Sequence, residues 1–158
     1  MTEIRIRTAT LTDIPEILAC HTAAFEPYRA SYSPDGFHDT VLDRDTARRR
    51  LAEMTVLVAE QDDGSVVGTI GYQSVGNGEG HLRGMAVLPT HLGGGIADRL
   101  LDAAESGLLA AGCTRVTLDT TAPLTRAIRF YERHGYRATG QVGDFFGMAL
   151  YEYEKTLT

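Results

Sequence analysis

Three consecutive glycines at residues 93–95 lie between an apolar segment and an amphipathic one, and this arrangement suits phosphate binding. The apolar segment, 82–88, predicts a strand that Pro89 ends, and a helix is expected to begin at about Ile96. The first turn of a helix has free backbone N–H groups and carries about half a unit of positive charge. Because glycine has no Cβ, a ligand can approach those groups closely. We therefore expect an anion site at this helix N-terminus.

Two well-known phosphate motifs do not fit this segment. The dinucleotide motif G-x-G-x-x-G follows the first strand of its fold and needs a third glycine where Asp98 stands. A P-loop needs Gly-Lys-Ser/Thr, and the sequence has no such tripeptide. A tight turn that binds nothing is the structural alternative, and the glycines alone do not decide between a turn and a ligand site.

Strands and helices alternate along the chain, which predicts the α/β class. The segment 26–42 has no clean period and several aromatic residues, so we expect a loop that covers a site. The arginine run 48–50 is interpreted as a solvated helix face, and the two strands within 81–119 should be parallel. The expected strands lie at about 3–8, 55–60, 66–75, 82–88, 115–119 and 148–155, and the expected helices at about 14–25, 45–53, 96–112 and 124–134.

Composition narrows the classes of protein that remain. The 158 residues predict one domain, 1–158, and 43% hydrophobic with 23% charged residues is typical of a globular chain. No apolar run approaches the roughly 20 residues that span a membrane, and the alternating N-terminus reads as a strand instead of a signal peptide. A net charge of −6 argues against nucleic-acid binding. We expect a cytoplasmic protein with neither a membrane nor a nucleic-acid partner.

A second motif near the C-terminus gives the glycine segment its context. The pattern Gln/Arg-x-x-Gly-x-Gly/Ala falls on residues 92–97, and Ala-x-x-x-Tyr-x-x-x-Gly-Phe/Tyr falls on 127–136. With these motifs and its order of strands, nearly the whole chain resembles the GNAT superfamily of N-acetyltransferases. The resemblance implies a mixed, mostly antiparallel sheet of six to seven strands flanked by helices on both faces. It also implies acetyl-CoA as the acyl donor. The histidines show no metal-ligand spacing and the sequence has no CxxC, so we expect no metal.

Two residues depart from the family pattern. Leu92 stands where the family has Gln or Arg, and Leu124 stands where it often has Asn. Side-chain contacts to the coenzyme are therefore expected to be fewer, and backbone amides to carry the binding. The coenzyme site that the resemblance implies consists of Met85, Ala86, Val87, Leu92, Gly93, Gly94, Gly95, Ile96, Ala97, Leu124 and Tyr131.

Acetyl transfer to an amine needs a neutral amine, a stabilised thioester oxygen and a proton for the departing thiolate. The resemblance assigns the proton to Tyr131 and the oxygen to the backbone amides of 85–87, where Gly84 is consistent with a bulge. Some family members use a glutamate on the fourth strand as the base, and in this sequence His81 occupies that position. The ordinary pKa of histidine suits that role. Glu79 should face the same side of the strand and is a second candidate base.

The acceptor is expected to lie against the 26–42 segment and a turn near the C-terminus. These regions vary most within the family, so its identity stays open, although the acidic chain favours a small-molecule amine. A non-catalytic acyl-CoA-binding or sensor module on the same fold is the alternative function. The oligomeric state is open as well, with a homodimer common among family members. The expected acceptor contacts are Tyr28, Tyr32, Phe37, His38, Phe145 and Phe146.

Overall fold

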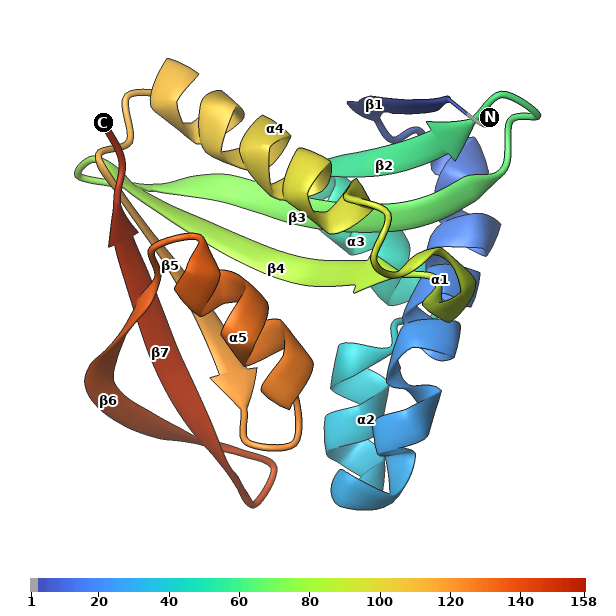
Figure 1. Cartoon of the computed structure of the whole chain (residues 1–158). Coiled ribbons are helices and arrows are strands. Elements are labelled where there is room, and N and C mark those ends of the chain that lie inside the picture. The colour runs from blue at the N-terminus through green and yellow to red at the C-terminus, as the bar shows by residue number, and fades with distance from the viewer. Residues whose placement is uncertain (1–2) are drawn as a thin grey trace.

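The computed structural model describes residues 3–158, and its centre is one seven-stranded sheet (Figure 1). The strands lie in the order β1-β2-β3-β4-β5-β7-β6, and every neighbouring pair is antiparallel except β4 and β5. The predicted α/β class, the mostly antiparallel sheet and the parallel β4–β5 pair are confirmed. The strands are β1 (Ile4–Thr8), β2 (Thr55–Gln61), β3 (Val66–Gly76), β4 (Glu79–Val87), β5 (Arg115–Thr121), β6 (Arg137–Phe145) and β7 (Met148–Thr156).

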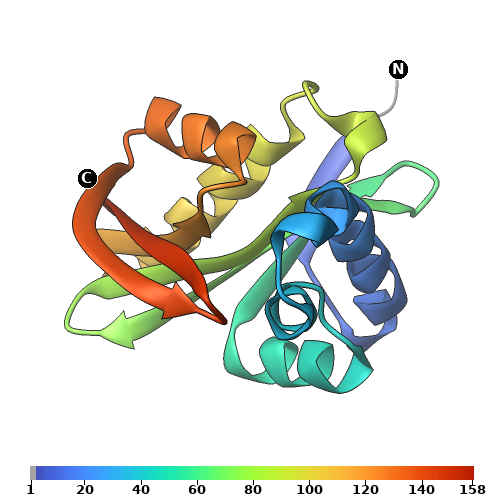
Figure 2. The same cartoon turned by 90° about the horizontal axis from the view of Figure 1, so that it is seen from below.

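Helices cover both faces of this sheet. α1 and α3 lie on one face, and α4 and α5 lie on the other (Figures 1 and 2). α4 presents one apolar stripe to the sheet, and its members are all buried: Ile96, Leu100, Leu101, Ala104 and Leu108. The helices are α1 (Ile14–Phe25), α2 (Pro34–Thr40), α3 (Arg44–Glu53), α4 (Ile96–Ala110) and α5 (Thr125–Arg133), with short 3₁₀ turns η1 (Leu11–Asp13), η2 (Glu26–Ser31) and η3 (Pro89–His91).

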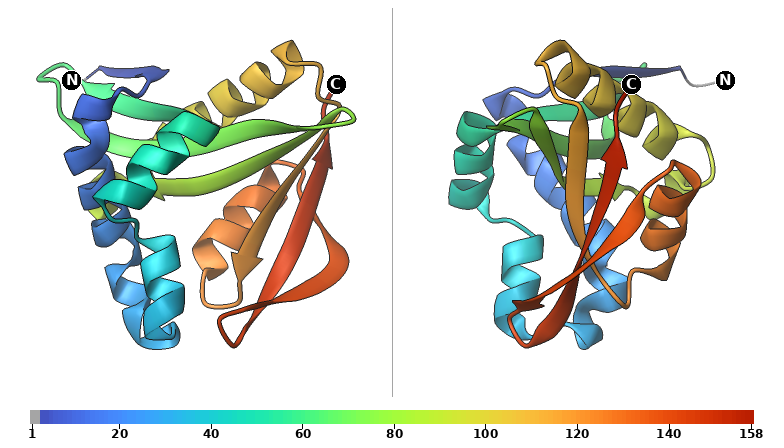
Figure 3. Two further views of the ribbon diagram at one scale, coloured as in Figure 1. Left: turned by 180° about the vertical axis from the view of Figure 1, so that it is seen from behind. Right: turned by 90° about the vertical axis from the view of Figure 1, so that its left-hand side faces the viewer.

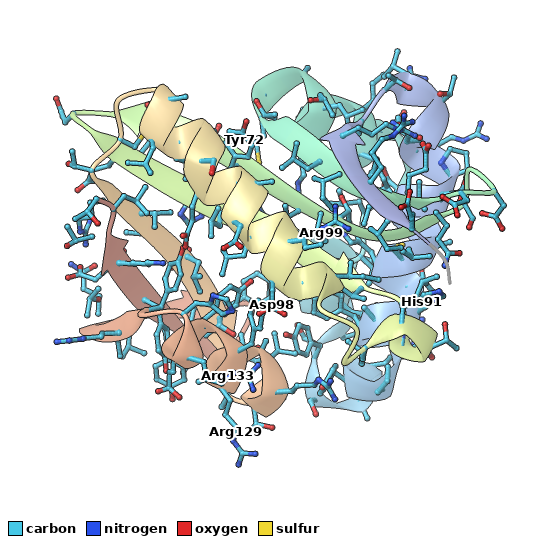
Figure 4. All side chains as sticks on the ribbon, turned by 45° about the horizontal axis from the view of Figure 1, so that its top comes forward. Tyr72, His91, Asp98, Arg99, Arg129 and Arg133 are labelled. Carbon is cyan, nitrogen blue, oxygen red and sulfur yellow. The ribbon has the colours of Figure 1, made fainter. Side chains whose placement is uncertain are left out.

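Glycines allow α4 to lie close to the sheet. A Cβ added at Gly80 of β4 would lie 2.6 Å from Cδ2 of Leu108, and one added at Gly107 would overlap the Tyr72 ring. Figure 4 shows Tyr72 beside α4. The tight contact fixes α4, and with it the helix N-terminus that follows the glycine segment.

The sheet splits between its two parallel strands. β4 and β5 pair only from Glu79 opposite Arg115 to His81 opposite Thr117, and beyond that point they diverge (Figure 1). On its other edge β4 stays paired with β3, where a bulge contains Gly84 with a φ of 71°. The bulge expected at Gly84 is therefore confirmed.

The segment 26–42 is helical, and the expectation of an irregular loop is wrong. Ser33 caps α2 by accepting a hydrogen bond from the Gly36 N–H at 3.2 Å, and Pro34 supplies the first helical position. A helix of seven residues is too short to establish a readable apolar period. This explains why the sequence pattern does not reveal it.

β6 is absent from the strands that the sequence pattern predicts. It is an edge strand, and most of its residues are exposed, so it has no alternation of apolar and polar positions to detect. It joins β7 through a two-residue turn in which Phe146 and Gly147 have φ values of 49° and 93°. Figures 2 and 3 show the tip of this hairpin directed toward α2.

Candidate active site

The split between β4 and β5 opens into a cleft of about 1210 Å³. Its walls come from β4 and the start of α4, from β5 and α5, from the η2–α2 segment and from the tip of the β6–β7 hairpin. The structure thus brings most of the predicted site residues to one cavity: Tyr28, Tyr32, His81, Met85, Ala86, Val87, Leu92, Gly93, Gly95, Ile96, Ala97, Leu124, Tyr131, Phe145 and Phe146.

The glycine segment forms the entrance to α4. Gly93 and Gly95 both have a φ of 83°, a left-handed conformation that a residue with a Cβ adopts only at a cost. Gly95 is the N-cap of α4 and no side chain caps this helix, so the N–H groups of its first turn remain free for a ligand. Gly94 is exposed beside them and does not itself line the cleft.

A hydrogen bond joins the start of α4 to the end of α5. Nε2 of His134 lies 2.8 Å from Oδ1 of Asp98, which is the acidic residue of the first turn of α4. Figure 4 shows Asp98 between the two helices, close to Arg133. The pair fixes the distance between the two sides of the cleft at its glycine-lined end.

Tyr131 lies on α5 with its ring in the core and its surface on the cleft. Its ring packs edge to face on Phe130 and Tyr136, with centroid distances of 5.4 and 5.6 Å. Burial raises the pKa of its hydroxyl well above the ordinary value for tyrosine, and no hydrogen bond among residues 3–158 opposes that shift. The hydroxyl therefore stays protonated and free to donate.

His81 lies at the vertex of the split. Its Nδ1 lies 2.9 Å from Oγ1 of Thr117, and its Nε2 lies 3.9 Å from Oδ2 of Asp119. Burial lowers the pKa of the imidazole, and the nearby Asp119 charge partly opposes that shift. The ring is therefore neutral at pH 7 and can accept a proton.

Three other predicted residues point elsewhere. Glu79 begins β4 below the split and accepts a hydrogen bond at 2.8 Å from Arg115, outside the cleft. Phe37 is buried under the guanidinium of Arg29, 4.1 Å from its ring centroid, and the next residue, His38, is turned to solvent. Because this segment is helical and not extended, adjacent side chains diverge, and the two do not reach the acceptor end of the cleft.

The acceptor end also contains polar residues that the sequence analysis missed. Asp119 and Thr121 lie on β5, and the Thr121 hydroxyl is 2.7 Å from the Tyr32 hydroxyl. Nη2 of Arg83 lies 3.2 Å from Oδ2 of Asp39, which joins β4 to α2. Arg50 lines the cleft as well, so the arginine run is not wholly a solvated face. Only the alternation of side chains along β5 could have indicated from the sequence that Asp119 faces the cleft, because its partner His81 lies on another strand, far away along the chain.

No helix within residues 3–158 has both the length and the apolar character needed to cross a bilayer. Over the same residues, no group of three or more His, Cys, Asp and Glu side chains is placed to hold a metal ion. Cys20 and Cys113 are both free and buried.

A sheet that splits beside a glycine-opened helix is the architecture of the acetyltransferases. The profile of the Acetyltransferase (GNAT) family matches residues 17–136, and the chain belongs to that family.

Solved structures share this fold. A GNAT-family acetyltransferase from Staphylococcus aureus superposes with a TM-score of 0.80 at 19% identity, over 99% of this chain and 100% of that one. The PaiA N-acetyltransferase of Thermoplasma acidophilum, solved with coenzyme A, gives 0.84 at 16% identity over 98% and 99% of the two chains. A ribosomal-protein-alanine N-acetyltransferase from Brucella melitensis gives 0.76 at 26% identity over 97% and 99%.

Proposed function

We propose that this protein transfers an acetyl group from acetyl-CoA directly to the primary amine of a small-molecule acceptor. The observation that carries the proposal is that His81 and Tyr131 line one cleft, which also contains the unpaired edge of β4 and the uncapped start of α4. A base, an acid and a phosphate site in one cavity meet the demands of acyl transfer from a coenzyme thioester.

The coenzyme is proposed to bind along the split. Beyond His81 the β4 edge is no longer paired to β5, so its amides can bond to the pantetheine arm as a neighbouring strand would. The pyrophosphate is assigned to the amides of residues 93–97, because Leu92 offers no polar contact there. Arg126, Arg129 and Arg133 of α5 line the same cleft, which favours an anionic ligand. Figure 4 shows Arg129 extending outward from α5.

The base and the acid of this reaction are assigned to residues on opposite sides of the cleft. His81 takes a proton from the acceptor ammonium, and the neutral nitrogen attacks the thioester carbonyl carbon. The C–N bond forms and the C–S bond breaks, with the carbonyl oxygen held by backbone amides of residues 85–87. Tyr131 gives its proton to the departing sulfur, which leaves as the free thiol of coenzyme A. The acylated nitrogen then loses its second proton to the Tyr131 phenolate and becomes the neutral amide, and His81 releases its proton to solvent.

Release of free thiol from acetyl-CoA, measured against a panel of primary amines, tests this function. We expect acetyl-CoA to raise the melting temperature by mass action and thiol to appear only when an amine is present. Absence of any thermal shift would contradict coenzyme binding. A clear shift without turnover on any amine would favour the non-catalytic acyl-CoA-binding module instead.

A further inference from the structure

Arg50 differs from the two arginines that precede it on α3. Arg48 and Arg49 are exposed, whereas Arg50 is half-buried and lines the cleft. Within the part of the chain that the structure describes, its guanidinium takes part in no hydrogen bond and no ion pair. Burial and the neighbouring Arg83 lower the pKa of Arg50 to about 10, which still leaves it charged at pH 7. A cation withdrawn from water without a counter-ion is costly, so it calls for an explanation.

The bulge in β4 makes room for this guanidinium. A Cβ added at Gly84 would lie 2.5 Å from Nη1 of Arg50, so only glycine leaves the space that the arginine occupies. Behind the bulge, Nε2 of His21 lies 3.1 Å from the Gly84 carbonyl oxygen. Because a carbonyl only accepts, Nε2 carries the proton, and burial keeps the ring neutral by lowering the pKa of His21 to about 4. Within residues 3–158 the buried Nδ1 has no hydrogen-bond partner. The surroundings of Arg50 on this side are therefore neutral.

Asp39 and Glu53 raise the pKa of Arg50 through their charge, but within residues 3–158 neither forms an ion pair with it. Asp39 is engaged by Arg83 at 3.2 Å, and Glu53 is exposed on α3 and does not line the cleft. Arg83 adds a second positive charge to the same wall. Arg50 thus lines the cleft with its hydrogen-bonding capacity unused, and a guanidinium can bind a carboxylate through two parallel bonds.

The positive charge of Arg83 acts on both Arg50 and the proposed base, His81. Arg83 stands two residues after His81 on β4, and its positive charge lowers the pKa of both His81 and Arg50. On the other side of His81, Asp119 contributes a negative charge at 3.9 Å. The acceptor end is therefore acidic beside the base and cationic beyond Arg83, a pattern complementary to a small zwitterion.

We propose that Arg50 binds a carboxylate of the acceptor, so that the acceptor is an amine bearing an acid group a few bonds away, such as a free amino acid. The inference rests on the proposed acetyl transfer, because it names the class of amine that would reach His81. It assigns the ammonium to the His81 and Asp119 side and the carboxylate to Arg50.

Matched acceptor pairs test this without changing the protein. The standard L-amino acids and their C-terminal amides are compared as acceptors by thiol release, and their binding is measured by calorimetry with coenzyme A present. Loss of one charge-assisted pair corresponds to about 10- to 100-fold, so we expect the amide of the best amino acid to be poorer by that factor in kcat/KM and in affinity. Equal use of amino acids and amides would overturn the inference while leaving acetyl transfer intact.

Substitution of Arg50 supplies the second measurement. Arg50→Met should raise KM for the best amino acid by about 10- to 100-fold, leave KM for acetyl-CoA unchanged and abolish the preference for acid over amide. Arg50→Lys should restore part of the preference, and Arg49→Met, one residue away on the exposed face, should behave as wild type. An unchanged preference in folded Arg50→Met would overturn the role of Arg50.

Measurements of amino-acid binding distinguish a failure of this inference from a failure of the proposed acetyl transfer. If no amine is acetylated but an amino acid binds and Arg50→Met weakens that binding, the Arg50 site stands and the catalytic function fails. If neither amino acids nor amides bind or react, the inference is overturned.

Discussion

His81 and Thr117 are the last pair of residues that joins β4 to β5, and their side chains meet at 2.9 Å between Nδ1 and Oγ1. The sheet opens immediately beyond them, so the proposed base stands where the backbone of β4 first becomes free to bind a ligand. The contact also fixes the imidazole ring, which leaves Nε2 directed toward Asp119. One pair of residues thus marks the end of the sheet and the start of the site.

Activity should fall in acid because His81 gains a proton. Burial lowers the pKa of His81, so kcat/KM should be full at neutral pH and decline only below the ordinary histidine value of about 6.5. His81→Gln should remove this acid limb. Asp119 raises the His81 pKa, so Asp119→Asn should move the limb to lower pH. Glu79→Gln is the control, since Glu79 is paired with Arg115; a limb lost in that variant would make Glu79 the base.

Tyr131→Phe should lower kcat by about tenfold or more, because the thiolate then leaves without a proton donor. Acetyl-CoA binding, measured by titration, should stay near wild type since the ring packing is kept. Tyr136→Phe is a matched control, because this hydroxyl donates to Glu105 at 2.7 Å and Tyr136 does not line the cleft. Unchanged turnover in Tyr131→Phe would dismiss its role as the acid.

The sequence predicted the fold well because its signals are local. Apolar periodicity assigned α4 and the central strands, and a glycine just before the segment 85–87 indicated the bulge at Gly84. The contacts at the acceptor end could not be predicted, because Asp119 approaches His81 only once β4 and β5 pair across a long crossover. Arg50 could not be separated from Arg48 by residue type, because only the packing of α3 turns it inward. The single domain and the cytoplasmic location stay predictions, and the oligomeric state stays open.

Gly84→Ala should disturb both stability and acceptor binding. The backbone at Gly84 has a φ of 71°, and a Cβ there would displace the Arg50 guanidinium. We expect the free energy of unfolding to fall by about 1–3 kcal/mol and KM for a carboxylate-bearing amine to rise. Gly64→Ala provides the comparison, because Gly64 has a φ of 87° but nothing within 4 Å of an added Cβ. If backbone strain were the whole effect, Gly84→Ala and Gly64→Ala would lose the same free energy of unfolding and would show the same KM.

Stability should depend on pH through His21, which is buried with its pKa lowered to about 4. Desolvation is the largest cause, and the Arg50 charge adds to it. The unfolded chain takes up a proton near pH 6.5 while the folded chain does not, so the unfolded state is favoured as the pH falls. The contribution is intact above pH 6.5 and is lost progressively down to about pH 4, by roughly 3 kcal/mol in total.

Urea unfolding between pH 4 and 7 measures this loss, and His21→Gln isolates it. Glutamine can still donate to the Gly84 carbonyl but does not titrate, so the variant should lack the His21 part of the slope while other groups contribute equally to both proteins. Identical slopes in the two proteins would mean that His21 does not titrate across this range. A smaller difference would mean that water reaches Nδ1 and that the site behind the bulge is less dry than the packing indicates.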